Sequence, residues 1–287
     1  MAGISTREFR GRKGNAMEHE LYIGRSRMGN RVCISLAEPP RIGILASSGS
    51  GKTGLLTNLV LQLSIGAFRE RVQFVGFDPK LVSLHSLEPR LSIPAVTEPS
   101  KYMGYLLKIE QIMNNRLSDM QRRGWTKIDP WLHSDEYPQL IVIVEELPSF
   151  VGNPELAANE QKAIAKWFDS YLTRCRAANM GAIICSHTYA STDSISTLAR
   201  SQLQTRFIGR CGIQEAHLFN EGQDEKCSVL KLTEPGEFYL SDEGKFNEWT
   251  RMKTWFTDET KARDLANRYA IDTRDIGLGW TVESPWG

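Results

Sequence analysis

Five short apolar runs constrain the fold of this chain more than any other feature of its sequence. They are mostly rich in Val and Ile, are separated by stretches long enough for helices, and cover residues 41–46, 72–78, 140–146, 181–187 and 205–211. Short, nearly continuous apolar runs are typical of strands that are buried on both faces. The pattern therefore predicts an α/β fold with a mainly parallel central sheet flanked by helices.

The segments between the runs carry apolar residues at helical spacing. The stripes are Leu55, Leu56, Leu59 and Leu63, then Leu106, Ile109, Met113, Leu117 and Met120, and then Ile164, Phe168, Tyr171, Leu172 and Cys175. We interpret each stripe as the core-facing side of a helix.

Two further segments alternate about turn residues, which predicts small β-hairpins. One covers residues 20–36, before the first run, and the other covers residues 235–256 near the end of the chain. A last helix is expected after Thr257, which we predict to cap its N-terminus.

The remaining segments mark the expected domain limits. Residues 1–19 carry the basic cluster Arg7–Lys13 and are predicted to form a flexible arm. This arm is either a solvated tail or a contact with DNA phosphates or another subunit. Residues 271–287 are an uninformative tail, so a single α/β domain with small β additions is expected over residues 20–270.

Composition and charge exclude several classes of protein. The chain has 287 residues, 41% hydrophobic and 24% charged, as in an ordinary globular protein. The net charge of +1 gives no global basic field, so any nucleic-acid contact must come from locally placed Lys and Arg. Scattered cysteines indicate a reducing compartment, and no apolar run approaches the roughly 20 residues of a membrane span. We expect a cytoplasmic protein without direct membrane insertion.

The segment Ile44–Gly54, ILASSGSGKTG, has the pattern of a phosphate-binding loop whose first glycine is replaced by Ala46. In the pattern G-x-x-x-x-G-K-[ST], backbone N–H groups point at phosphate oxygens, the lysine reaches the terminal phosphates and the hydroxyl binds Mg²⁺. Alanine is the smallest replacement for a glycine that only begins the turn. The predicted ATP-binding residues are Ala46, Ser47, Ser48, Gly49, Ser50, Gly51, Lys52, Thr53 and Gly54, and the alternative is a Ser/Gly-rich surface loop.

Two adjacent carboxylates, Glu145 and Glu146, follow the third apolar run. They would lie at the carboxyl end of a strand, where ligands of open α/β sheets bind. An ATPase needs one carboxylate beside magnesium and another that orients or deprotonates the attacking water. We therefore predict that Glu145 supports Mg²⁺ together with Thr53, and that Glu146 is the catalytic base. The alternative is an acidic pair that ends a strand in solvent.

Six segments in this order resemble the motifs of the FtsK/SpoIIIE family of DNA translocases. They are ILASSGSGKT, VQFVGFDPKLVSL, LIVIVEEL, RCRAANMGAIICSHT, LQTRFIGRC and PGEFYLSDEG. The Asp-Pro-Lys sequence at residues 78–80 is the more specific mark, because the phosphate loop alone is shared by many enzymes. The resemblance extends from about Glu20 to Ala270. It implies a RecA-like P-loop NTPase fold in which the run 181–187 lies between the runs 41–46 and 140–146.

The resemblance also implies an assembly and further site residues. The family forms rings, commonly hexamers, with ATP at subunit boundaries and double-stranded DNA in the central channel. His187 stands where the family usually has a glutamine that senses the γ-phosphate, and a structural histidine is the alternative. Arg206 matches a family arginine and is the candidate arginine finger for the neighbouring subunit, with Arg174 and Arg176 as rivals. A surface ion pair is the alternative for each arginine. The catalytic set is therefore expected to be Lys52, Glu146, His187 and Arg206.

Contacts with DNA are expected in the loops 121–131 and 148–162, which should face the channel. Arg122, Arg123 and Lys127 are the candidates for phosphate contacts, and a solvated helix end is the alternative. The membrane-spanning region, N-terminal subdomain and winged-helix module of the family are absent from the sequence. We therefore expect a partner protein, or the basic arm, to supply DNA targeting and membrane placement.

Three hypotheses for function follow. The first is an ATP-dependent double-stranded DNA translocase that acts in DNA transfer, segregation or packaging, with ATP and Mg²⁺ as its ligands. The second is a protein-secretion motor, because relatives of the family energise such systems, although those usually carry tandem ATPase units. The third is a nucleotide-binding scaffold that scarcely hydrolyses ATP, motivated by Glu145 and His187.

Overall fold

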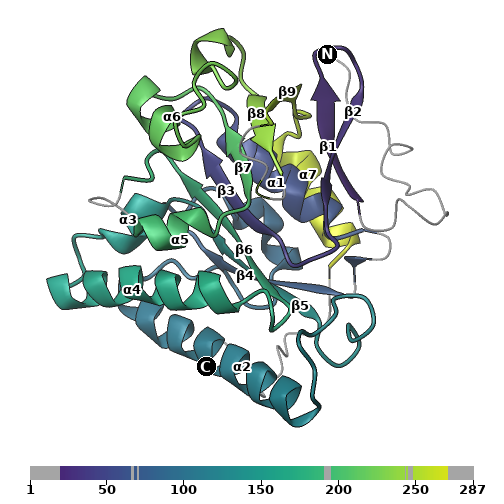
Figure 1. The fold of residues 1–287 in the computed structure, drawn as a ribbon, viewed down its shortest axis with the longest axis vertical. Helices are drawn as coiled ribbons and strands as arrows, with labels where there is room; N and C mark the ends of the chain where they lie inside the picture. Colours follow the sequence, from purple (N-terminus) through teal and green to yellow (C-terminus); the bar gives the residue numbers. More distant parts are fainter. Residues whose placement is uncertain are drawn as a thin grey trace.

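Nine strands form one sheet in the part of the chain that the structure describes (Figure 1). The structure is a computed structural model, and it describes residues 20–65, 68–69, 71–190, 195–242, 244 and 248–270. The predicted N-terminal arm and C-terminal tail lie outside these residues.

The strands are short and mostly buried, as the apolar runs predicted. They are β1 (Glu20–Ser26), β2 (Arg31–Ser35), β3 (Arg41–Leu45), β4 (Val72–Phe77), β5 (Gln139–Val144), β6 (Met180–Ser186), β7 (Thr205–Ile208), β8 (Glu237–Ser241) and β9 (Thr250–Lys253). Their order across the sheet is β2-β1-β9-β8-β7-β3-β6-β5-β4.

The centre of the sheet is parallel. Strand β3 pairs in parallel with β6 on one side and with β7 on the other, and β5 pairs in parallel with β6 and β4. The predicted position of β6 between β3 and β5 is therefore confirmed. Leu45, the last residue of β3, lies opposite both Ser186 and Ile208. Three carboxyl ends of strands thus meet where the glycine-rich loop begins.

Both predicted hairpins form, and they extend the central sheet instead of standing apart from it. Strand β8 pairs antiparallel with β7, β9 with β8, β1 with β9, and β2 with β1. The hairpin from the start of the described chain is therefore attached to the sheet through the hairpin from its end.

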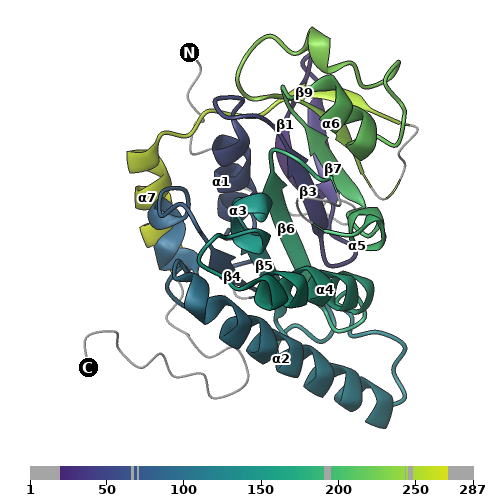
Figure 2. The same ribbon diagram turned by 90° about the vertical axis from the view of Figure 1, so that its left-hand side faces the viewer.

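Helices cover both faces of the sheet. They are α1 (Lys52–Gln62), α2 (Tyr102–Arg122), α3 (Leu147–Val151), α4 (Ala158–Arg174), α5 (Thr197–Ser201), α6 (Ile213–Phe219) and α7 (Glu259–Arg268), with short 3₁₀ turns η2 (His85–Arg90), η3 (Pro99–Lys101) and η4 (Val229–Lys231). In Figure 2, α1 and α7 lie on one side of the sheet and α4 on the other.

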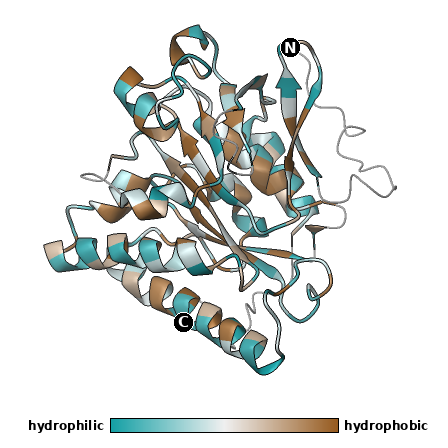
Figure 3. Cartoon of the chain, in the orientation of Figure 1, coloured by the Kyte–Doolittle hydropathy of each residue, from teal (hydrophilic) through white to brown (hydrophobic). Residues whose placement is uncertain are grey.

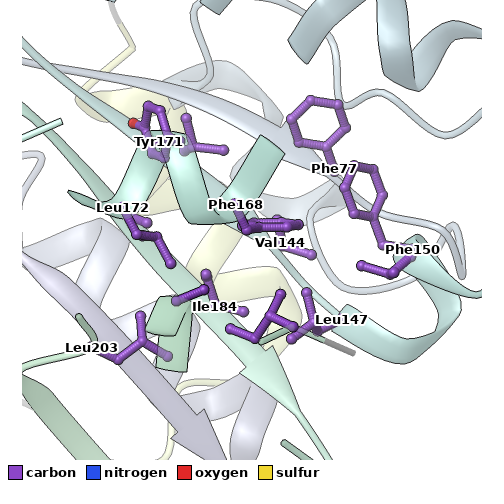
Figure 4. Close-up of a cluster of buried hydrophobic side chains, with 14 of the residues drawn as sticks. Phe77, Val144, Leu147, Phe150, Phe168, Tyr171, Leu172, Ile184 and Leu203 are labelled. Atoms are coloured by element: carbon purple, nitrogen blue, oxygen red, sulfur yellow. The ribbon is translucent and has the colours of Figure 1, made fainter. Parts of the chain in front are cut away.

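Two hydrophobic clusters fill the spaces between the sheet and its helices, because successive side chains of a buried strand point to opposite faces. In β5, Val142 and Val144 contact the cluster that includes α2 and α4, whereas Ile141 and Ile143 contact the cluster that includes α1 and α7. Figure 4 shows Val144 close to Phe168 of α4, within the first of these clusters.

The long helices are amphipathic, and α2 and α4 carry both hydrophilic and hydrophobic residues in Figure 3. Every residue of the three predicted stripes is buried except Leu117 and Met120, which are half-buried near the end of α2. Burial of one face of each helix holds the sheet rigidly, and the sheet in turn fixes the loops at its carboxyl edge.

The prediction that Thr257 caps the last helix is wrong. Asp258 is the cap of α7, because its carboxylate accepts a hydrogen bond of 2.9 Å from the backbone N–H of Lys261. The buried Thr257 hydroxyl instead donates to Asn58 Oδ1 of α1 at 2.8 Å. Thr257 and Asp258 are both residue types that can cap a helix, but the Thr257 hydroxyl contacts α1 and so Asp258 is the cap.

Within the described part of the chain, no helix has both the length and the apolar character needed to cross a membrane.

Candidate nucleotide-binding site

The glycine-rich loop connects β3 to α1, and backbone hydrogen bonds to two other strand ends hold its beginning. The N–H of Ala46 donates to the carbonyl of Ser186 at 3.0 Å, and the N–H of Ser47 donates to the carbonyl of Arg210 at 2.8 Å. The Ala46 side chain is buried, and a Cβ added at Gly209 would lie 2.9 Å from its methyl group. The first loop position therefore has room for a methyl group only because its neighbour is glycine.

Two loop positions require glycine for different reasons. Gly49 and Gly51 have φ values of 73° and 93°, a backbone region that other L-residues rarely adopt. A Cβ at Gly51 would also lie 2.5 Å from the backbone nitrogen of Gly236, which donates to the carbonyl of Ser50 at 2.9 Å. The Pro-Gly segment before β8 thus packs against the loop and donates a backbone hydrogen bond to it.

The loop leads directly into α1, whose N-terminus begins at Lys52 with Gly51 in the capping position. Ser47, Ser48, Gly49 and Thr53 are exposed, whereas Ser50 is buried and donates to the carbonyl of Arg210 at 3.0 Å. An exposed loop that ends in a helix N-terminus offers free N–H groups and a partial positive charge, which suits a phosphate group.

Lys52 and Glu146 form an ion pair at the centre of the site. The Lys52 Nζ donates to Glu146 Oε2 at 2.5 Å, and Lys80 Nζ donates to the same oxygen at 3.2 Å. The second oxygen, Oε1, lies 2.9 Å from His187 Nδ1 and accepts a longer bond of 3.3 Å from the His187 backbone N–H. The structure therefore brings together three of the four predicted catalytic residues.

The surroundings of Glu146 favour its ionised form. Burial alone would raise the pKa of this carboxyl, but the hydrogen bond and charge of Lys52, the bond from His187 and the charge of Lys80 together lower it below its usual range. Glu146 is almost fully buried, whereas half of the His187 side chain is exposed. An ionised carboxylate at this place can accept a proton.

The neighbouring carboxyl, Glu145, has a different environment. Its Oε1 accepts a hydrogen bond of 2.7 Å from the Ser83 hydroxyl, while its buried Oε2 has no hydrogen-bond partner among the described residues. Burial raises the pKa of Glu145, and the Ser83 bond and the Lys52 charge offset only part of this effect. The two adjacent carboxyls therefore have pKa values that are displaced in opposite directions.

Asp78 organises the segment that carries Lys80 and Ser83. Its buried carboxylate accepts bonds of 2.9 Å from the N–H groups of both Ser83 and Leu84, and a longer bond of 3.3 Å from that of Lys80. The Asp-Pro-Lys motif marks the family resemblance in the sequence, but no role at the site was predicted for Asp78 or Lys80. The position of this motif after a buried strand, at the same edge as Glu145, was the available signal.

The residues predicted to support Mg²⁺ fit that ion. Thr53 offers an exposed hydroxyl at the start of α1, and Glu145 offers a carboxylate oxygen that no described residue binds. The described residues contain no cluster of three His, Cys, Asp or Glu side chains that would hold a metal without help. Mg²⁺ is usually bound by one or two protein oxygens together with phosphates and water, and Thr53 and Glu145 would supply such oxygens.

The arginine-finger prediction for Arg206 is contradicted by its position. Its side chain has 0% relative exposure, and it donates to the carbonyls of Leu203 at 2.9 Å and Phe219 at 2.7 Å. It also forms an ion pair with Glu221 at 2.8 Å. A guanidinium that is enclosed in its own subunit cannot extend into a neighbouring one, so Arg206 is a structural residue. Its location within an apolar run was the signal for burial.

The rival arginines lie at the end of α4 and just after it, where Arg174 is half-buried and Arg176 is exposed. Arg174 lies 3.8 Å from Glu110, and Arg176 lies 3.2 Å from Glu38, with 52% of the Arg176 side chain exposed. Both residues precede β6, so they lie at the amino edge of the sheet, opposite to the glycine-rich loop of the same subunit.

The candidate DNA-binding residues also lie at the amino edge, between α2 and β5. Arg122 pairs with Asp119, Arg123 with Glu136, and Lys127 with Glu38 at 2.9 Å. Each cation thus has an acidic partner in its own chain, as the alternative of a solvated helix end anticipated. The second expected loop, 148–162, begins after β5 and so lies at the other end of that strand, roughly 20 Å away for a strand of this length.

The chain is similar in sequence to proteins of a known family. A sequence model of the FtsK/SpoIIIE family matches residues 8–200. A DNA translocase FtsK of Streptococcus pyogenes is 27% identical over 72% of this chain, and one of Staphylococcus epidermidis is 24% identical over 88%. The chain spans only 27% and 32% of the length of these two relatives.

Solved structures share the fold at low sequence identity. The conjugation coupling protein TcpA of pCW3, in a monomer form with ATPγS, has a TM-score of 0.75 at 15% identity, and the match covers 93% of this chain and 72% of that one. EssC (ATPases 2 and 3) of Geobacillus thermodenitrificans has a TM-score of 0.69 at 16% identity, covering 91% and 50% of the two chains. The fold is therefore that of P-loop ATPase motor domains, as predicted.

Proposed function

Because the chain belongs to the FtsK/SpoIIIE family, we propose that it is an ATPase that couples the hydrolysis of MgATP to the movement of double-stranded DNA. The observation that carries the proposal is the contact between Lys52 of the glycine-rich loop and Glu146 at the end of β5. A phosphate-binding cation and a carboxylate able to act as a base lie at one point of the carboxyl edge. This is the minimal arrangement for hydrolysis of a terminal phosphate.

The geometry suggests how these residues would divide the work. The loop N–H groups and Lys52 bind the phosphates, and Lys52 must leave Glu146 to do so. Glu146 then accepts the proton of the attacking water, while Lys80 and His187 keep its carboxylate oriented. Thr53 and Glu145 would hold Mg²⁺, which when bound neutralises charge on the phosphates. We propose that His187 reports the presence of the terminal phosphate, because its ring contacts Glu146, the proposed base.

Ring assembly would complete the site. We propose a head-to-tail ring, of six subunits by analogy with the family, in which an exposed arginine of one subunit reaches the site of the next. Arg206 cannot fill this role, so Arg174 and Arg176 are the candidates. Their carboxylate partners, Glu110 and Glu38, are half-buried, and a phosphate of the next subunit's nucleotide would have to replace them.

DNA is favoured as the cargo by the sequence relatives, which are named DNA translocases at 24–27% identity. The likeness to the type VII secretion ATPase EccC of Thermomonospora curvata, at 15% identity, is a likeness of fold alone. Arg122, Arg123 and Lys127 remain the proposed phosphate contacts, and binding would require DNA to replace their acidic partners. Such contacts predict binding that weakens steeply with added salt. A partner protein or the residues before Glu20 would supply targeting, and we propose a cytoplasmic location.

ATP turnover measured with and without long linear duplex DNA tests the proposal. We expect turnover that rises several-fold with duplex DNA and that disappears in Lys52→Ala. An ATP turnover rate that is unchanged by DNA but increased by a partner protein would indicate a secretion motor. A wild-type protein that binds ATP and hydrolyses none under any of these conditions would indicate a scaffold.

A further inference from the structure

We propose that Arg210 is an additional ligand for the nucleotide phosphates, contributed by the same subunit as the glycine-rich loop. The inference rests on the proposed function and assigns a residue for which the sequence analysis gave no role. Arg210 follows β7, whose Ile208 lies beside Leu45 of β3, so the fold brings Arg210 directly to the loop.

The backbone of Arg210 and its side chain contact the loop in different ways. The Arg210 carbonyl accepts the N–H of Ser47 at 2.8 Å and the hydroxyl of Ser50 at 3.0 Å. The guanidinium contacts a loop residue between these two, because Nη2 donates to the carbonyl of Gly49 at 3.1 Å. The backbone contacts hold the loop in place, and they would persist with any side chain at this position.

No residue in the described part of the chain neutralises the charge of the Arg210 guanidinium. None of the ion pairs among the described residues includes Arg210, whereas Lys52 and Lys80 both pair with Glu146. The Nε of Arg210 is buried without a hydrogen-bond partner in the same part of the chain. The Arg210 guanidinium has five N–H donors and a full positive charge, but among the described residues it makes one hydrogen bond, to a neutral carbonyl.

These features match what a phosphate group requires. Arginine binds phosphate through paired, charge-assisted hydrogen bonds, which are stronger than a bond to a backbone carbonyl. Gly49 lies in the exposed part of the loop, and its carbonyl is also accessible to water, so the present bond is easily exchanged. We infer that Arg210 moves from Gly49 to a phosphate oxygen of a bound nucleoside triphosphate.

Binding of a fluorescent ATPγS analogue, with tripolyphosphate as competitor, tests the inference. We expect Arg210→Ala to raise both dissociation constants about 10- to 100-fold, by the usual value of a charge-assisted hydrogen bond, and Arg210→Lys to recover part of the loss. Arg263→Ala, an exposed arginine of α7, is the matched control and should bind as the wild type does.

The possible results separate this inference from the proposed function. If Lys52→Ala weakens binding but Arg210→Ala stays within twofold of the wild type, Arg210 is not a ligand and the inference is overturned. If the wild type binds neither ATPγS nor tripolyphosphate, the proposed function fails and the inference fails with it. Thermal unfolding of each variant shows whether the fold is intact, and Arg210→Met replaces the alanine variant if that one unfolds. A loss that appears only together with unfolding in both variants would mean a structural role.

Discussion

Lys52 and Glu146 are hydrogen-bonded to each other over 2.5 Å, although they lie 94 positions apart in the sequence. The residue proposed to bind phosphate is thus held by the residue proposed to activate water. A bound nucleotide has to compete with this ion pair for Lys52. When a nucleotide binds, Lys52 would exchange Glu146 for a phosphate, and the same exchange would leave Glu146 able to activate water.

Glu146→Gln separates nucleotide binding from ATP hydrolysis. We expect turnover to fall by a factor of roughly 100 to 10,000, as is usual when a general base is lost. ATP affinity should stay the same or increase by a few-fold, because Lys52 loses a charged competitor. Fluorescent-nucleotide titration and phosphate release measure the two effects. If this variant hydrolyses ATP at the wild-type rate, Glu146 is not the base.

Lys80→Ala tests whether the Asp-Pro-Lys segment tunes the base. The Lys80 charge helps to lower the pKa of Glu146, so its removal should raise that pKa. Glu146 must be ionised to accept a proton, and the rate falls as pH drops through its pKa. The acid limb of the pH–rate profile should therefore shift to higher pH. The effect should be modest, because Lys80 is about half exposed. Lys101→Ala, which breaks an exposed pair with Glu98, is the control and should leave the profile unchanged.

Glu145→Gln should stabilise the protein without nucleotide, and more so at high pH. The pKa of Glu145 is raised in the folded state, so its charged form destabilises the fold. This penalty is absent below the unfolded-state pKa and grows as pH rises through the folded-state pKa. We expect a gain on the order of 1 kcal/mol at pH 8, or roughly 2–4 °C in Tm, and a smaller gain at pH 4. A gain that is equal at both pH values would contradict this account.

Three glycines of the site form a graded series. Gly51→Ala should destabilise the protein strongly and abolish nucleotide binding, because φ is 93° and the new methyl group would meet Gly236. Gly49→Ala has an unfavourable φ but open space, so a cost of about 1 kcal/mol is expected. Gly54→Ala lies in α1 with open space and should be neutral or stabilising. Urea unfolding of the three variants checks the order, and equal losses at all three positions would contradict it.

Arg206→Ala should destabilise the protein strongly, whereas Arg176→Ala should leave its stability almost unchanged. Removal of the buried Arg206 leaves carbonyl groups and Glu221 without their donor, which should lower the free energy of unfolding by about 3–5 kcal/mol. Removal of the exposed Arg176 should change it by less than about 1 kcal/mol. Urea denaturation measures both values.

Mixing experiments then identify the arginine that acts between subunits. If Arg176 acts on the next site, a mixture of Arg176→Ala with Lys52→Ala should regain turnover, because each variant supplies the part that the other lacks. A stable but inactive Arg206→Ala protein that is rescued in the same way would restore Arg206 as the arginine finger.

Much of the fold could be predicted from the sequence, because a strand buried on both faces and a helix with one apolar face leave distinct periodic patterns. The five runs and three stripes become strands and helices for this reason. The hairpins were predicted as small additions to the domain, but their attachment to the central sheet was not predicted, because no local pattern specifies that β1 pairs with β9.

The site was predictable only in part. A motif can be identified from a short segment, as with Lys52 and Glu146, but a contact such as Lys80 with Glu146 joins residues that are far apart. Arg206 shows the converse error, since a resemblance suggested a role that its place in a buried strand excludes. The environment of a charge depends on the assembled sheet and cannot be obtained from one segment.

The strand order has a consequence for how the protein is made on the ribosome. Both neighbours of β3, namely β6 and β7, are synthesised after it, and β1 and β2 join the sheet only through β9. Almost the whole described chain must therefore leave the ribosome before all nine strands can pair. Nascent chains that stop before Thr250 should therefore expose the edge of β8 and the apolar face of the first hairpin, and they should be the species that chaperones bind.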